Sequence, residues 1–138
     1  MKKRIAILFA ALLLALPVIL CGCTVYTSSY KAVGFVHSNV SDSGYMSFYS
    51  FEGKMVFRMK WDGATEGSIK YSAKLESGEA TVYYDCGGEK TELFKIGAGD
   101  EISSSVGTIG KGTVYVIVET NGKCQNGDFR FSLEKTEK

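Results

Sequence analysis

The stretch MVFRMKW, residues 55–61, decides the fold class, because large apolar side chains alternate along it with smaller or charged ones. Positions 55, 57, 59 and 61 carry the large apolar side chains, and Arg58 and Lys60 point the other way. A repeat of two residues is typical of a β-strand with one face in a hydrophobic core and the other in water. We therefore expect a strand here that is exposed on its basic side.

Runs with the same repeat lie on both sides of this strand, separated by glycine-containing turn signals. In Tyr45–Phe51, residues 45, 47, 49 and 51 are expected to share one face, with Met46 and Phe48 on the other, before Glu52-Gly53 turns the chain. Both faces of Thr113–Thr120 are apolar, which predicts a central strand. The other expected strands cover residues 33–37, 69–75, 80–86, 93–96, 102–109 and 129–133.

This spacing predicts one all-β domain over residues 31–134, an antiparallel sandwich of two sheets with about eight strands. Beyond the N-terminus no stretch holds a helical repeat of 3.6 residues over three turns. The charged residues 135–138 are expected to fray.

The N-terminus has the pattern of a secretory signal peptide. Lys2, Lys3 and Arg4 are followed by the uncharged apolar run Ile5–Leu20, in which Pro17 ends a helix near the cleavage region. The run of sixteen residues is shorter than the roughly 20 that a membrane span needs. We expect residues 1–22 to be a signal helix that is removed.

The four residues Leu20-Cys21-Gly22-Cys23 resemble the bacterial lipobox, and the chain in this respect is similar to a bacterial lipoprotein. The resemblance implies that Cys23 carries a diacylglyceryl group and that residues 23–30 tether the domain to the outer side of the cell membrane. Two acyl chains anchor a protein stably where one does not. An ordinary cleaved signal and an uncleaved signal anchor are the alternatives. Cys21 fits less well as the acceptor, because Leu20 would then occupy the small-residue position before cleavage.

The charge balance argues against a nucleic-acid partner. The whole chain of 138 residues has 16 Lys and Arg against 15 Asp and Glu. Loss of the signal removes three cations, which leaves 13 against 15, a net charge of −2. Such a balance provides no electrostatic attraction to a polyanion.

Besides Cys23, the cysteines that remain after processing are Cys86 and Cys124. An exported protein can form disulfides, and both residues lie near expected strand ends, so we expect a disulfide between them. Two buried free thiols are one alternative, and a metal or redox pair is another. A zinc site would need more ligands than the single histidine, His37, supplies.

The residues do not assemble a recognisable catalytic set. His37 lies in an apolar stripe beside Phe35, where a structural role is the usual one, and no nucleophile elbow or phosphate-binding glycine loop is present. Acidic loop residues are candidates for Ca²⁺ only if they converge, and their spacing is irregular; they are Asp85, Glu89, Asp100 and Glu101. We expect a non-enzymatic protein without a cofactor or metal.

Aromatic residues are the one enriched class, with 8 Tyr, 8 Phe and 1 Trp. Exposed rings can stack on sugars or anchor a protein partner, whereas cross-strand packing is the ordinary role of strand tyrosines. Tyr83 is out of phase with its neighbours and is the best candidate for a binding residue. Tyr115 and Tyr49 are the next candidates.

Three segments resemble small bacterial secreted sandwich modules of the pre-peptidase C-terminal type: Tyr45–Glu52, Gly112–Glu119 and Gly127–Leu133. The resemblance implies a jelly-roll-like accessory domain without catalytic activity, and it implies no particular ligand. The acidic strand that is common in those modules is absent from this sequence. The resemblance therefore does not support Ca²⁺ binding.

The sequence thus predicts a lipid-anchored, extracytoplasmic binding module, with carbohydrate or another envelope polymer as its ligand. The alternative is a structural or assembly lipoprotein that binds an envelope protein through a sheet face or edge. A small hydrolase would need a cleft that brings His37 beside a serine or a carboxylate.

Overall fold

The computed structural model describes residues 26–136, so the signal peptide, Cys21 and Cys23 lie outside the described residues. Nine strands account for most of this range. Their bounds are β1 Ser29–Val33, β2 Val36–Val40, β3 Ser43–Trp61, β4 Gly67–Ser77, β5 Ala80–Asp85, β6 Lys90–Ile96, β7 Asp100–Ile109, β8 Gly112–Thr120 and β9 Cys124–Lys135. Within residues 26–136, no helix is both long and apolar enough to span a bilayer.

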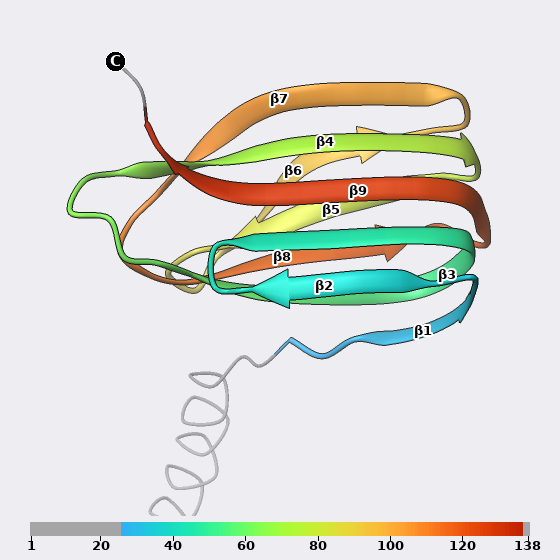
Figure 1. Ribbon diagram of the computed structural model, residues 1–138, viewed down its shortest axis with the longest axis horizontal. Helices are drawn as coiled ribbons and strands as arrows, with labels where there is room; N and C mark the ends of the chain where they lie inside the picture. Colours follow the sequence, from blue (N-terminus) through green and yellow to red (C-terminus); the bar gives the residue numbers. More distant parts are fainter. Residues whose placement is uncertain (1–25, 137–138) are drawn as a thin grey trace, which may run out of the picture.

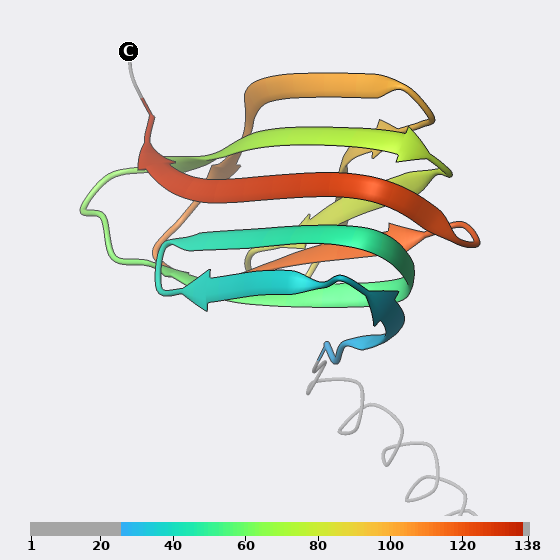
Figure 2. The ribbon, with the colours of Figure 1, turned by 45° about the vertical axis from the view of Figure 1, so that its right-hand side comes forward.

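The strands form two antiparallel layers (Figures 1 and 2). The front sheet has the order β2-β3-β9-β4-β7, and the back sheet has the order β3-β8-β5-β6. The long strand β3 belongs to both sheets, and β1 pairs beside it. With the two arms of β3 counted separately, β3 to β9 provide eight strands in the order of a jelly roll. The predicted fold class is confirmed.

Strand β3 passes from one sheet to the other at Gly53. Its first arm, Ser43–Phe51, pairs with β9, and its return arm, Lys54–Trp61, pairs with β8. Gly53 has φ 130°, and a Cβ there would collide with the carbonyl oxygen of Ser29. The predicted change of direction at this point is therefore present, although β3 runs through it as one element.

The bend corrects the expected orientation of Phe51. This residue is expected on the face of Tyr45 and Tyr49, but it is buried, as are Met46 and Phe48. The alternation slips by one residue just before Gly53, where Ser50 and Phe51 are both buried. A strict two-residue repeat does not survive a change of sheet, because the core then lies on the other side of the chain.

The outer edge of the return arm is covered rather than left open. The backbone N–H of Val56 donates to Ser28 Oγ at 2.8 Å, and that of Lys60 donates to the Ser41 carbonyl oxygen at 2.6 Å. Between these two bonds, the side-chain amide of Asn39 binds the backbone of Arg58. In the orientation that gives both amide groups a partner, its oxygen accepts from Arg58 N at 3.1 Å and its nitrogen donates to Arg58 O at 3.0 Å. An edge whose hydrogen-bonding groups are occupied does not recruit a strand from another molecule.

The core lies between the two sheets and is built mainly from aromatic and β-branched side chains. Phe48 and Phe129 stack at 6.2 Å between ring centroids, and Tyr71 stacks on Phe94 at 4.4 Å. The expected central strand is confirmed, because β8 is paired on both sides and Val114, Val116 and Val118 are fully buried. Ile117 is also fully buried, but it faces the outer side of the back sheet and is not part of the core cluster.

Two expectations about the chain ends need correction. Ser29 and Tyr30, expected in the tether, belong to β1 and pair with β3. Lys135, expected in the frayed tail, is the last residue of β9.

The predicted disulfide is wrong, since Cys86 and Cys124 are both free thiols. Cys124 Sγ donates to the carbonyl oxygen of Glu79, just before β5 begins, whereas Cys86 directly follows the end of β5. The length of β5 therefore separates them, about 20 Å at the usual rise per residue. A disulfide needs Cα atoms within about 7 Å.

Candidate functional site

The outer face of the front sheet carries polar and aromatic side chains in rows that cross all five strands. Registers place Ser38 beside Tyr45, Tyr45 beside Arg130, Arg130 beside Ser72 and Ser72 beside Ser103. Residues paired across a sheet project to the same side. The row therefore crosses four gaps between strands, about 19 Å at the usual strand spacing. We call it the tyrosine–arginine row.

A second row runs alongside the first, and it is charged. Its members are paired in the order Val36, Ser47, Asp128, Lys74 and Glu101. Both rows face outward, because the residues that alternate with them on β9 and β4 lie in the core. Carboxylate, ammonium and hydroxyl groups thus alternate along this face.

Arg130 is held in place by contacts to both rows. Its guanidinium carbon lies 4.7 Å from the centroid of the Tyr45 ring, a cation–π contact. Its Nε donates to Asp128 Oδ1 at 3.2 Å. The Arg130 side chain remains 64% exposed and that of Asp128 only 24%. The remaining guanidinium donors are therefore open to the solvent.

A shallow cavity of about 330 Å³ opens next to Arg130. It is lined by residues of β4, β7 and β9, and the polar ones are Ser72, Lys74, Glu101, Ser103, Asp128 and Arg130. Tyr49 is 60% exposed on the outer side of the first arm of β3, toward its bend. The face therefore combines aromatic rings with convergent donors and acceptors, as small-molecule sites do.

The other two predicted tyrosines lie on the opposite side of the molecule from Tyr49. Tyr83 on β5 and Tyr115 on β8 project from the outer face of the back sheet. Lys90 Nζ lies 4.3 Å above the Tyr83 ring and 2.9 Å from Glu119 Oε1, so the ring is half covered. The structure therefore does not bring the three predicted binding residues together.

Tyr115 is covered by the N-terminal segment. The Tyr26 ring lies 5.1 Å from that of Tyr115, and the Tyr26 hydroxyl donates to Asp85 Oδ2 at 2.5 Å. Asp85 is 3% exposed and also accepts from Gly88 N at 2.8 Å. The hydrogen bond to Asp85, with burial as a smaller cause, raises the pKa of Tyr26 to about 12. The contact is thus strongest while Tyr26 is protonated.

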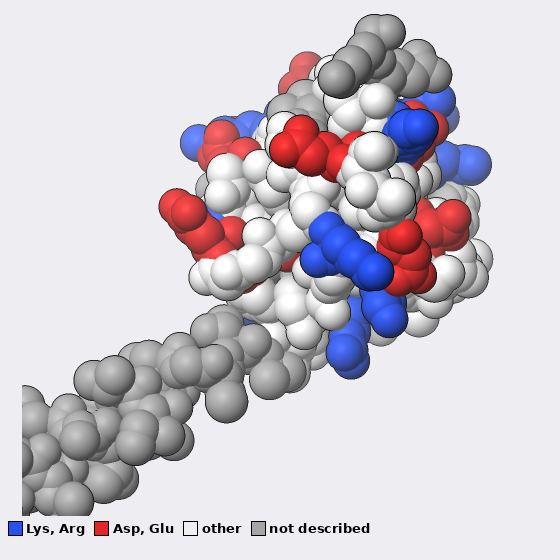
Figure 3. All heavy atoms as spheres, turned by 90° about the vertical axis from the view of Figure 1, so that its left-hand side faces the viewer, with Lys and Arg blue, Asp and Glu red and all other residues white. Residues whose placement is uncertain are grey.

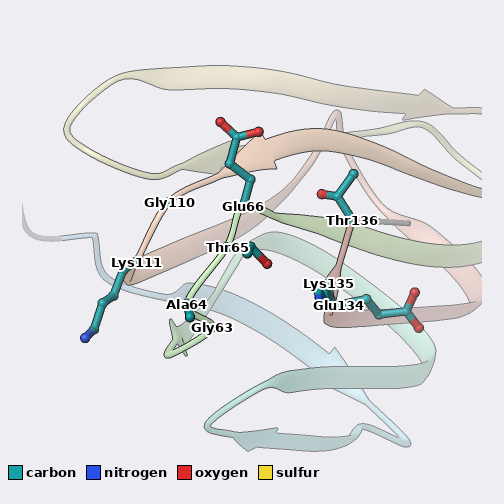
Figure 4. Close-up of a pocket in the computed structure, with 9 residues that line it drawn as sticks. All are labelled: Gly63, Ala64, Thr65, Glu66, Gly110, Lys111, Glu134, Lys135 and Thr136. Carbon is teal, nitrogen blue, oxygen red and sulfur yellow. The ribbon is translucent and has the colours of Figure 1, made fainter. Parts of the chain in front are cut away.

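A larger cavity, about 1450 Å³, lies among the loops at the end of the sandwich where β3 and β9 finish. Figure 4 shows that the charged groups of Lys111, Glu66 and Glu134 on its wall point in different directions. Figure 3 shows acidic and basic residues interspersed over this end. Because these groups do not converge, the cavity lacks the arrangement that acid–base catalysis requires.

The residues weighed for catalysis or metal binding remain apart in the described chain. No group of three or more His, Cys, Asp or Glu side chains within residues 26–136 is arranged to hold a metal ion. His37 is exposed on β2 and stacks on Phe35 at 4.9 Å between ring centroids.

Comparison with known proteins finds similar structures but no similar sequences. No protein-family model and no curated protein matches this sequence. The structure is similar to that of TmCBM61 in complex with β-1,4-galactotriose, with a TM-score of 0.44 and 14% identity, covering 80% of this chain and 86% of that one. A structure described as "CBM4 structure and function" has a TM-score of 0.42 and 12% identity, covering 76% and 80%.

A ruminal GH26 endo-β-1,4-mannanase is also similar, with a TM-score of 0.43 and 14% identity over 67% of this chain. The chain spans only 20% of the length of that enzyme. These likenesses concern the arrangement of the strands.

Proposed function

We propose that this protein is a non-enzymatic carbohydrate-binding module held by a lipid on the outer side of the cell membrane. The observation that carries the binding part is the tyrosine–arginine row, with Arg130 fixed between the Tyr45 ring and Asp128 beside an open cavity. The lipid part rests on the lipobox-like residues that end at Cys23.

The chemistry of the row matches that of a sugar. A pyranose ring has an apolar face of C–H groups, which packs on an aromatic ring, and a rim of hydroxyls that donate and accept. Tyr49 supplies an exposed ring, and Tyr45 supplies a ring that Arg130 partly covers. Arg130 and Lys74 supply donors, and Asp128 supplies acceptors. Since Arg130 and Asp128 are already oriented, a ligand pays less ordering entropy when it binds them.

The face is also suited to a neutral glycan. Lys70, Lys74 and Arg130 on it are matched by Glu101, Asp128 and Glu134, and Lys70 lies 3.7 Å from Glu134. Glu76 near the end of β4 adds one further carboxylate. With a surplus of only one charge, the field above the face attracts neither polyanions nor polycations strongly. Hydroxyl-rich polymers without charge are therefore the expected ligands.

Affinity electrophoresis through gels that contain soluble neutral polysaccharides tests the binding proposal. We expect retardation in at least one β-linked glucan, mannan or galactan gel, and no retardation in a gel of polyacrylamide alone. Unchanged mobility in all of the polysaccharide gels, together with no capture by insoluble cell-wall material, would argue against carbohydrate as the ligand.

Labelling with a radioactive fatty acid in a bacterial host tests the anchor. We expect label on the wild-type chain and on Cys21→Ser, and none on Cys23→Ser. Label on the Cys23→Ser variant at the wild-type level would place the lipid elsewhere, and absence of label from the wild type would remove the anchor.

One observation favours a second candidate function, binding of an envelope protein at the edge of the front sheet. Val33, Val36 and Val40 are 62%, 61% and 52% exposed along β1 and β2. Exposed apolar residues on an edge strand are the usual substrate for strand addition. Crosslinking in cells that retrieves one stoichiometric partner, and loses it in Val36→Lys, would favour this function over carbohydrate binding.

A further inference from the structure

The N-terminal segment crosses the outer face of the back sheet rather than leaving from a sandwich end. Ser28 is bonded to Val56 on the return arm of β3, and Tyr26 reaches over Tyr115 to Asp85 on β5. Cys23 precedes Tyr26 by three residues. An extended chain of three residues spans at most about 10 Å. A lipid on Cys23 would therefore hold this face within that distance of the bilayer surface.

The same face carries two cations that have no partner among the described residues. Lys60, Lys90 and Lys95 each meet a carboxylate within 4.0 Å. Lys54 and Arg58 form no ion pair within residues 26–136. Both belong to the return arm of β3. Lys54 pairs with Ser29 on one side and with Glu119 on the other, where the Glu119 carboxylate is held by Lys90 at 2.9 Å. Arg58 pairs with Tyr115. The two free cations thus flank the segment that leads to Cys23.

We propose that the outer face of the back sheet rests on an anionic bilayer, with Lys54 and Arg58 against the lipid phosphate groups. The proposal rests on the lipid anchor of the proposed function. A separation of about 10 Å is comparable to the Debye length at 0.1 M ionic strength, so the attraction is only partly screened. Tyr83 and Tyr26 on this face are suited to the interface, where rings with a polar tip are enriched.

This orientation has a consequence for the tyrosine–arginine row. The row lies on the outer face of the opposite sheet. A back sheet that faces the membrane directs Tyr45 and Arg130 away from it, toward polymers outside the membrane. The jelly roll then acts as a spacer with a lipid-facing side and a ligand-facing side.

Lysine acylation on vesicles tests the orientation. The lipidated protein is added to preformed vesicles of phosphatidylcholine with and without phosphatidylglycerol, and mass spectrometry follows acylation by a water-soluble reagent. We expect Lys54 and Lys60 to react about fivefold more slowly when phosphatidylglycerol is present. This factor corresponds to the free energy with which an anionic leaflet attracts a single cationic side chain. Lys70 and Lys74 on the front sheet are expected to keep their rates.

Arg58→Glu provides the matched variant, and Lys70→Glu on the front sheet provides its control. Arg58→Glu is expected to restore the rates of Lys54 and Lys60, and Lys70→Glu to leave their protection intact. Equal rates for Lys54 and Lys60 on both kinds of vesicle, with the lipid confirmed on the Cys23 peptide, would overturn the docking alone. A Cys23 peptide without lipid would overturn both the docking and the anchor.

Discussion

The Tyr26 hydroxyl donates to the Asp85 carboxylate at 2.5 Å across 59 residues of sequence. Asp85 ends β5, the third strand of the back sheet, while Tyr26 precedes β1. The N-terminal segment therefore contacts two strands of the back sheet, β8 through Tyr115 and β5 through Asp85. These contacts determine which face of the sandwich lies nearest to whatever holds the N-terminus.

Tyr26→Phe keeps the ring over Tyr115 and removes only this hydrogen bond. We predict a loss of about 1 kcal/mol of unfolding free energy near pH 7, the scale of a partly exposed bond to a carboxylate. The pKa of Tyr26 rises from 10.0 to about 12 in the folded state. Its added stability is therefore complete below pH 10 and is lost as the pH rises toward 12.

Urea unfolding of the wild type and of Tyr26→Phe across this range measures the difference. The control is Tyr30→Phe, because Tyr30 forms no side-chain hydrogen bond with another described residue. A difference between wild type and Tyr26→Phe that stayed constant from pH 8 to pH 12 would exclude the hydrogen bond as its source.

Gly53→Ala tests the bend that carries β3 between the sheets. Alanine at φ 130° is strained, and its Cβ would also collide with Ser29 O. We predict a loss of roughly 3 kcal/mol or more, from backbone strain and overpacking together. Gly99→Ala is the control, since Gly99 has φ 82° but open space around it, and it is expected to cost about 1 kcal/mol. Equal thermal stabilities of the two variants would contradict the crowded bend.

The two cysteines should differ in reactivity. Burial raises the pKa of the Cys124 thiol. Both thiols donate to a carbonyl oxygen, Cys124 to Glu79 at 3.3 Å and Cys86 to Gly110 at 3.7 Å, but Cys86 is only half-buried. We predict that iodoacetamide modifies Cys86 in the native protein and Cys124 only after unfolding. Peptide mapping measures both sites; a linked Cys86–Cys124 peptide from the oxidised protein would contradict the fold at β5.

Much of the fold is readable from single segments. The alternation in residues 55–61 and the apolar faces of Thr113–Thr120 each express a local repeat, and both strands form as predicted. Tyr26–Tyr30 has no such repeat and looks like a tether. Strand β1 nevertheless begins at Ser29, because the edge of β3 offers unpaired backbone groups to Ser28 and Ser29. This pairing depends on contacts between distant parts of the chain and not on a local repeat.

The site was less accessible from sequence. Tyr45 and Arg130 are 85 positions apart, and only the register of β3 against β9 makes them neighbours. The disulfide prediction failed for the same reason. The sequence shows that both cysteines lie near strand ends, but it does not show that Cys124 lies beside the start of β5 while Cys86 follows its end. Tyr83 lies on the outer face of the back sheet, but Lys90, which covers its ring, comes from the next strand, so the sequence around Tyr83 does not reveal the cover.

Isothermal titration of matched variants with the retarding polysaccharide shows whether Tyr45 and Arg130 form the binding face. Tyr45→Ala removes the ring under Arg130, and Tyr83→Ala removes a tyrosine from the opposite face. We predict about a tenfold loss of affinity for Tyr45→Ala, or about 1.4 kcal/mol, the scale for truncating an aromatic anchor, and wild-type affinity for Tyr83→Ala. Full affinity in Tyr45→Ala with loss in Tyr83→Ala would contradict this prediction.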